Sequence, residues 1–301
     1  MKRKVVKQGA STLTVSLPSK WSQKFGLKSG DEIHVEEKDN SLLFSCTNPH
    51  FIEKKVIDAN ELDFLVNRSI IGAYRTGHDE IKIISNETSK IDKFKNVVSE
   101  LLGFELLEEG SNFCVLRDVS GSSDREFDNL YRRSFLLIKN VTEESLEMLK
   151  AGKKNGLKSL VTLDKEVNKF TNNCLRHLNK KGYKEFTKTQ MIFLVVHKLE
   201  EIGDEHKNLL NKIVDEDVDM NNVMLSLYQQ VQELFGKTYE FSFKHRSETA
   251  KEIGRMYKEN KKDIQEAIMK VQNPSQIKVL FHLDSLNNKI IKILGSQLSF
   301  I

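Results

Sequence analysis

The chain has 301 residues, of which 39% are hydrophobic and 30% charged, and 47 Lys and Arg against 43 Asp and Glu give a net charge of +4. This composition predicts a folded protein with two or three hydrophobic cores. The sequence contains no run of about 18 uncharged apolar residues, so we do not expect a membrane-spanning helix. The basic N-terminus is not followed by an apolar leader, and the 3 cysteines are too widely spaced for a disulfide framework or a thiolate zinc site. We therefore expect a cytoplasmic protein.

Residues 1–47 predict a short segment that is rich in strands. Residues 13–17 alternate apolar and polar side chains, a short helix follows, and Gly26 stands where that helix needs a left-handed cap. Further strands are predicted at 33–36 and 42–44. A segment this short, with so little helix, cannot bury an adequate core alone, so we expect an intertwined dimer.

Residues 48–120 predict alternating strands and helices, which is typical of a small α/β domain. The glycines of this segment do not have the spacing of a phosphate-binding loop. The predicted strands and helices cover, in chain order, residues 54–57 (strand), 60–75 (helix), 80–84 (strand), 89–102 (helix), 105–108 (strand) and 113–117 (strand).

Residues 121–301 predict an all-helical domain, because apolar residues recur at spacings of three and four. The predicted breaks give six helices, several of them 20–28 residues long, which suit a bundle of two three-helix units. A shift of 84 residues aligns polar pairs of one half with those of the other, a weak internal repeat. The predicted breaks lie near residues 152–156, 182–183, 215–219, 236–239 and 273–274.

Four polar pairs in this domain are spaced i, i+4, so each pair lies on one helix face and could present two oxygens to one cation. Chance alone produces several such acidic pairs in a chain this rich in Asp and Glu, and the alternative is an ordinary solvated face. Gly203, inside the second pair, predicts close helix packing there. The four pairs are Asp164/Asn168, Glu200/Asp204, Glu248/Glu252 and Asp284/Asn288.

Two stretches resemble known families. Residues 199–204, L-E-E-I-G-D, resemble the L-E-R-I-G-D signature of PhoU proteins, phosphate-signalling regulators built from two three-helix repeats that carry E/D-x-x-x-D metal motifs. Residues 9–18 and 25–35, the latter F-G-L-K-S-G-D-E-I-H-V, resemble the swapped-hairpin DNA-binding domain of the AbrB/SpoVT/MazE family. Together they resemble archaeal PhoU-domain regulators that carry such an N-terminal domain.

The resemblance implies a multidomain α+β fold. It consists of a β-rich swapped-hairpin dimer domain (1–47), a small α/β middle domain (48–120) and an all-α PhoU-like bundle of two three-helix repeats (121–301). It also implies that the four polar pairs bind a metal. Asn168 and Asn288 stand where the PhoU pattern has Asp, and an amide supplies one oxygen without charge. We therefore expect one divalent cation, Mg²⁺ ahead of Zn²⁺, Mn²⁺ or Fe, or no metal.

Basic residues cluster near the N-terminus, and a dimer would carry two such clusters. Clustered cations favour binding to DNA phosphates. The alternative is a solvated tail. Small hydroxyl side chains nearby could add hydrogen bonds to phosphates or bases, and Trp21 could pack in the dimer core. The candidate DNA-binding residues are Lys2, Arg3, Lys4, Lys7, Ser11, Thr12, Thr14 and Lys20.

We therefore predict a homodimeric DNA-binding transcriptional regulator of phosphate uptake or metabolism, whose bundle senses an effector, a metal or a partner. The alternative is a signalling adaptor that docks on phosphate transporter subunits or a kinase, with residues 1–47 used only for dimerisation. A metal-storage or redox bundle would need carboxylates at Asn168 and Asn288. No G-x-S-x-G or H-x-x-x-H pattern is present, so we do not expect an enzyme.

Overall fold

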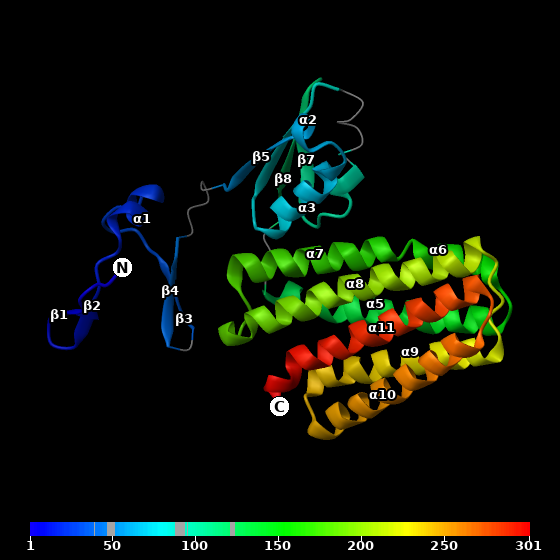
Figure 1. Cartoon of the computed structure of the whole chain (residues 1–301). Helices are drawn as coiled ribbons and strands as arrows, with labels where there is room; N and C mark the ends of the chain where they lie inside the picture. Colours follow the sequence, from blue (N-terminus) through cyan, green and yellow to red (C-terminus); the bar gives the residue numbers. More distant parts are fainter. Residues whose placement is uncertain (39, 47–51, 88–93, 95, 121–123) are drawn as a thin grey trace. The chain divides into compact units, whose positions relative to one another are not determined.

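The computed structural model describes residues 1–38, 40–46, 52–87, 94, 96–120 and 124–301. The chain is mixed α+β, with short strands at the N-terminus and a helical C-terminal region, which confirms this part of the prediction (Figure 1). It forms two compact units, Met1–Glu53 and Lys54–Ile301. The predicted segment boundaries at 48–49 and 121–123 lie outside the described residues.

The first unit contains two separate antiparallel hairpins, each a two-stranded sheet. Gly9, with φ of 72°, turns the first hairpin, and Gly26, with φ of 65°, follows the short helix as predicted. The predicted strand at 13–17 ends at Thr14, because only three residues of the first strand pair with it. The elements are β1 (Val6–Gln8), β2 (Thr12–Thr14), α1 (Ser19–Lys24), β3 (His34–Lys38) and β4 (Ser41–Ser45).

Apolar side chains of this unit lie in water. None of the described residues up to Cys46 is buried, and Val6, Leu13, Val35 and Leu42 are 58%, 70%, 51% and 55% exposed. An isolated two-stranded hairpin is marginally stable at best in water. Within the described part of the chain, the strands of the first unit therefore lack a surface on which to bury their apolar faces.

The second unit begins with a four-stranded sheet of order β5-β6-β8-β7, in which β5 and β6 are parallel and the other neighbours antiparallel. Asp58 caps the crossover, because its carboxylate accepts a hydrogen bond from the Asn60 N–H at 2.8 Å. The elements are β5 (Lys54–Asp58), α2 (Ala59–Leu62), the 3₁₀ turn η1 (Asp63–Leu65), α3 (Val66–Arg75), β6 (Glu80–Ile84), β7 (Phe104–Glu109) and β8 (Phe113–Asp118).

The helix predicted at 60–75 is in fact broken. Asp63 takes a positive φ of 46°, so α2 ends there and a 3₁₀ turn leads into α3. Helix α3 buries Ile70 and Tyr74 in one core with the strand residues Ile81 and Leu116. The first part of the helix predicted at 89–102 lies outside the described residues, and residues 96–98 are helical.

Six long helices follow, as predicted, with the short α6 between the first two of them. The predicted break at 236–239 is wrong: α9 runs through Gly236, because buried neighbours such as Phe235 and Phe241 outweigh the roughly 1 kcal/mol cost of a helical glycine. Helix α9 ends instead at His245, whose φ is 36°. The helices are α5 (Asp124–Lys150), α6 (Leu157–Val161), α7 (Asp164–Lys181), α8 (Thr189–Asp215), α9 (Asn222–Lys244), α10 (Ser247–Lys270) and α11 (Pro274–Gln297).

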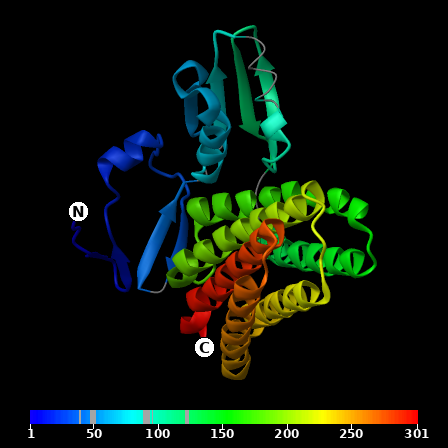
Figure 2. The ribbon, with the colours of Figure 1, turned by 45° about the vertical axis from the view of Figure 1, so that its right-hand side comes forward.

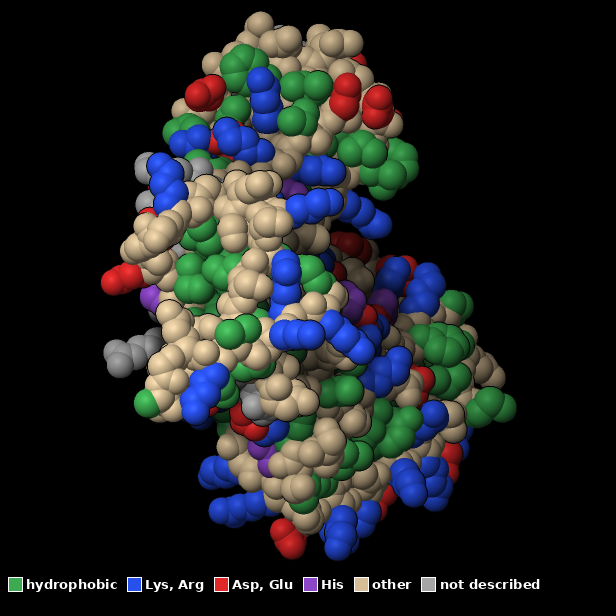
Figure 3. Space-filling model, turned by 90° about the vertical axis from the view of Figure 1, so that its left-hand side faces the viewer, with side chains coloured by type: hydrophobic (Ala, Val, Ile, Leu, Met, Phe, Trp, Pro, Cys, Tyr) green, Lys and Arg blue, Asp and Glu red, His purple; other side chains and the backbone are tan. Residues whose placement is uncertain are grey.

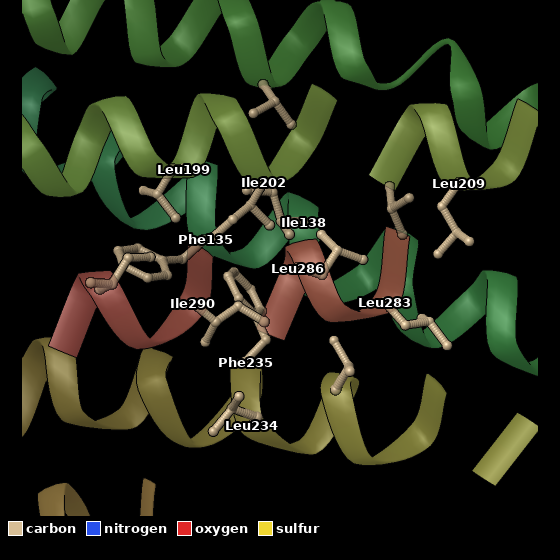
Figure 4. Packing of buried hydrophobic residues seen from close by; sticks show 14 of the residues in the cluster. Phe135, Ile138, Leu199, Ile202, Leu209, Leu234, Phe235, Leu283, Leu286 and Ile290 are labelled. Atoms are coloured by element: carbon tan, nitrogen blue, oxygen red, sulfur yellow. The ribbon is translucent and has the colours of Figure 1, made fainter. Parts of the chain in front are cut away.

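The core of this region forms around α8 and α11, which pack along each other. Figure 4 shows Leu199 and Ile202 of α8 facing Leu286 and Ile290 of α11, with Phe135 of α5 between them. Figure 2 shows α7 and α8 running side by side, in agreement with their contacts. None of the helices in the described part of the chain has the length and apolar character of a membrane span.

Candidate functional site

The N-terminal basic residues are accessible. Lys2, Arg3, Lys4 and Lys7 are exposed on and before β1, and Lys20 is exposed on α1. Ser11 and Thr12 are exposed in and after the β1–β2 turn. On the face that Figure 3 presents, Lys and Arg side chains lie between exposed hydrophobic ones.

Two of the residues discussed from the sequence, Thr14 and Trp21, form contacts within the first unit. The Thr14 hydroxyl, on the strand opposite β1, donates to the Val6 carbonyl at 3.2 Å. Trp21 is half-buried and packs against Phe25, with ring centroids 5.4 Å apart. Thr14 is thus less available than Ser11 and Thr12 to an external hydrogen-bond partner.

The structure brings the first two polar pairs together between α7 and α8. The Lys207 ammonium bridges them: its Nζ lies 2.6 Å from Asp164 Oδ2 and 2.8 Å from Asp204 Oδ1. Gly203 makes this approach possible, because a Cβ there would lie 3.1 Å from Val167 and 3.5 Å from Asp164 Oδ1. The close packing predicted at Gly203 is confirmed.

Asp164 is the most enclosed carboxylate of this group, with its side chain 8% exposed. Burial raises its pKa, and the Lys207 ammonium acts against that shift. Asp164 Oδ1 and Asn168 Oδ1 are buried, and no donor among the described residues forms a hydrogen bond with either atom. These two oxygens are thus hydrogen-bond acceptors without a donor among the described residues, on the helix that Lys207 contacts through Asp164.

Glu200 contacts the sheet domain. Its Oε1 accepts a hydrogen bond from Arg75 Nη2 at 2.5 Å, and Arg75 Nε donates to Asn172 Oδ1 at 2.7 Å. His197 Nδ1 lies 3.4 Å from Glu200 Oε2. Burial acts to raise the pKa of Glu200, but hydrogen bonding by His197 and the charge of Arg75 outweigh it, so the pKa is lowered. The Glu200 carboxylate is therefore ionised at pH 7, and its negative charge is balanced by Arg75.

Arg176 of α7 holds the sheet domain on the helices at the same interface. Its guanidinium, 5% exposed, donates at 2.9 Å to each of Asp79 and Asp118 and at 2.9 and 2.7 Å to the carbonyls of Tyr74 and His78. A buried charge with this many acceptors is well satisfied. The orientation of Arg75 toward Glu200 is thereby fixed.

The other two pairs do not form a matching cluster. Asn288 Nδ2 donates to Asp284 Oδ2 at 2.9 Å, and the Tyr257 hydroxyl donates to Asn288 Oδ1 at 3.0 Å. Glu252 lies about 7.5 Å along the α10 axis before Tyr257 and pairs instead with Lys237 of α9 at 3.5 Å.

Glu248 is exposed near the start of α10. Tyr257, which contacts Asn288, is thus about 1.4 turns from Glu252 and about 2.5 turns from Glu248. The shift of 84 residues misses this because α10 has 24 residues and α7 has 18, so the turn into the next helix comes later and different residues face each other.

The oxygen donors on α7 and α8 suit a hard cation, because carboxylates and amides are the ligands that such ions prefer. A cavity of about 20 Å³ lies beside Asp164, Gly203 and Lys207, enough for one water or ion. Among the described residues, no three His, Cys, Asp or Glu side chains converge as a metal group. Asp164 and Lys207 line this cavity, Asn168 does not, and its other walls are mainly apolar.

Two cations of this site, Arg75 and Lys207, were not among the predicted residues. Lys207 carries a local signal, since it stands three residues after Asp204 on one helix. Arg75 carries none, because its partner Glu200 lies 125 residues further along the chain. Compared with family models, with curated proteins and with solved structures, the chain has no match in any of the three.

Proposed function

We propose that this chain is a homodimeric DNA-binding transcriptional regulator, in which residues 1–47 of two copies pair as a swapped-hairpin domain of the AbrB type. The proposal rests on one observation: the first unit exposes both the apolar side chains of its strands and a cluster of cations. Asp31 is its first acidic residue, and Lys2, Arg3, Lys4 and Lys7 all precede it. A second copy would cover the apolar faces and double the cations.

We propose that the helical region is the sensing domain, a PhoU-like bundle of two three-helix repeats. We assign it a regulatory role in phosphate uptake or metabolism, following the L-E-E-I-G-D resemblance at residues 199–204. An effector can alter DNA affinity only if it binds more tightly to one arrangement of the DNA-binding units than to another. The effector that we propose is a divalent cation at Asp164 and Asn168, where it would compete with Lys207.

The test is fluorescence anisotropy of the full chain with labelled genomic-promoter duplexes over a salt series. We expect affinity to fall steeply with salt and the variant K2Q/R3Q/K4Q/K7Q to bind more weakly. Its log–log slope should be smaller by about 0.9 for each phosphate that the variant no longer neutralises. The matched control is K158Q/K251Q/R255Q/K258Q, which removes the same charge from exposed positions of the helical region.

Equal loss of affinity in both variants would mean that only net charge matters and would contradict a DNA site in the first unit. No binding at low salt would contradict the DNA role altogether, and co-purification with transporter or kinase partners would then be the next experiment.

A further inference from the structure

Figure 1 shows that α7 turns into α8 at the same end of the helical region as the C-terminus. A second cavity lies at this end. Its volume is about 490 Å³, in the range of sites for small organic ligands. Its walls come from the start of α5, the loop before α8, the end of α9 and the 3₁₀ turn η4 (Leu298–Phe300). It is separate from the Asp164 and Glu200 site, because Ile192, which lines it, precedes Glu200 by two turns of α8.

Cations line this cavity and are held by aromatic rings. The Arg132 guanidinium lies 4.7 Å from the centroid of Phe243, and the Lys188 ammonium lies 5.0 Å from that of Phe300. Lys184 adds a third positive charge. A cation–π contact does not neutralise a charge, and Arg132, which forms no ion pair with the described residues, remains able to bind an anion.

Two carboxylates share the walls. Asp128 Oδ2 lies 3.5 Å from Lys184 Nζ, and Glu185 Oε2 lies 2.5 Å from Lys188 Nζ. Both carboxylate side chains are 55% exposed, so their remaining oxygens are accessible to a ligand. Three cations against two carboxylates leave a net positive site that also offers acceptors for ligand hydroxyl groups.

His245 adds a polar atom that the described residues leave without a partner. Its Nε2 is buried without a hydrogen bond to any of them, although the ring packs edge-on against Phe300 at 5.3 Å. Burial, and then the charge of Lys188, lower the pKa of His245, so the ring is neutral at pH 7. A ligand that enters the cavity and reaches this buried nitrogen would find a neutral donor or acceptor.

We propose that this cavity is a nucleotide-binding site. The phosphates would contact Arg132 and Lys188, the ribose hydroxyls would donate to Asp128 or Glu185, and the base would lie against the aromatic walls near Tyr183 and His245. An inorganic anion would use only the cations and leave most of the cavity volume and the carboxylates unused. This inference does not rest on DNA binding, since the cavity lies wholly within the helical region.

The experiment titrates the full chain into N-methylanthraniloyl-ATP and follows fluorescence anisotropy. Unlabelled ATP, GTP, CTP, UTP, adenosine and tripolyphosphate then serve as competitors. We expect at least one nucleoside triphosphate to displace the probe at least tenfold better than tripolyphosphate or adenosine. Equal competition by tripolyphosphate, or no displacement by any nucleotide at millimolar concentration, would overturn the assignment.

The chain provides a matched pair of variants. Arg132→Gln removes a cation of the cavity, and we expect it to weaken binding of the probe at least tenfold. Arg133→Gln removes the next residue of α5, whose guanidinium stacks on Phe170 at 4.6 Å, outside the cavity. Because both arginines are exposed, neither change should unfold the helix. Equal weakening by the two variants would overturn the proposal, and so would no weakening by Arg132→Gln.

Discussion

At the scale of single residues, the acidic group on α7 and α8 is neutralised by the protein's own cations. Lys207 bridges Asp164 and Asp204, and Arg75 pairs with Glu200. A divalent ion would have to displace an ammonium that is already in place. Under the proposed function, a metal ion would therefore compete with the Lys207 ammonium for Asp164.

Replacing Lys207 with Met should raise the response to Mg²⁺ or Mn²⁺. Without Lys207, Asp164 and Asp204 repel each other, so we expect the melting temperature to fall in metal-free buffer and to recover with millimolar cation more than wild type does. Differential scanning fluorimetry measures both effects. Lys198→Met is the control, because Lys198 pairs only locally, with Glu201 at 2.7 Å. The same metal response in both variants would rule out a site at Asp164.

Glu205 gives a prediction for acid stability. Burial acts to raise its pKa, but hydrogen bonds from His282, Lys289 and Ser285 outweigh it and lower the pKa to about 2. A carboxyl with a depressed folded-state pKa stabilises the fold above its unfolded pKa of 4.5, and this contribution disappears as the pH falls toward 2.

We expect Glu205→Gln to lower the unfolding free energy by about 1.5–3 kcal/mol at pH 6, with the difference from wild type shrinking between pH 4.5 and 2. Urea denaturation at pH 6, 4 and 3 measures it. Glu266→Gln, at an exposed position, should change little at any pH. A difference that stays constant with pH would contradict the assigned role of the carboxylate.

At the scale of elements, periodicity predicts the strands of the sheet and the six long helices, because both depend on local patterns of apolar residues. It fails where packing outweighs propensity, as at Gly236, and where one residue leaves the helix, as at Asp63. The candidate site is predicted only for its α7 and α8 residues. The cations that neutralise them depend on tertiary contacts, and the helix register around Asp284 cannot be obtained from a fixed sequence shift.

Arg176 tests how strongly the sheet domain is held to the helices. Arg176→Met leaves Asp79 and Asp118 without its guanidinium, and removing one partner from a buried charge group costs about 3–5 kcal/mol. We expect faster hydrogen exchange in β6 and β8 and a lower urea midpoint. Arg133→Met, which removes an exposed cation–π contact, should cost less than about 1 kcal/mol. Equal effects would mean that the Arg176 contacts contribute no more than surface packing.

At the scale of the whole molecule, the two units differ in whether they bury a hydrophobic core. Residues 54–301 bury two hydrophobic clusters of their own, whereas the described part of residues 1–46 buries no side chain. In the dimer that we propose, a second copy would cover the exposed apolar strands of the first unit.

A charge placed on those strands should separate the copies. We expect Val35→Asp to convert a dimer into a monomer in sedimentation velocity experiments, because an ionised carboxylate cannot be buried unpaired. Val223→Asp on α9 is the control, since Val223 is similarly exposed, at 59%. Helical circular dichroism should be unchanged in both variants. A monomeric wild-type chain, or a dimer that survives Val35→Asp, would contradict assembly through the first unit.

The pairing of Arg75 with Glu200 also has a consequence for biosynthesis. Glu200 is translated 125 residues after Arg75, which takes about 6–25 s at 5–20 residues per second. For about the first 5–20 s of it, until Asn173 has been added 99 residues after Tyr74, the face of α3 that will dock on α7 has no partner on the nascent chain. The growing polypeptide thus passes through a stage at which α3 has been synthesised and the helix on which it docks has not.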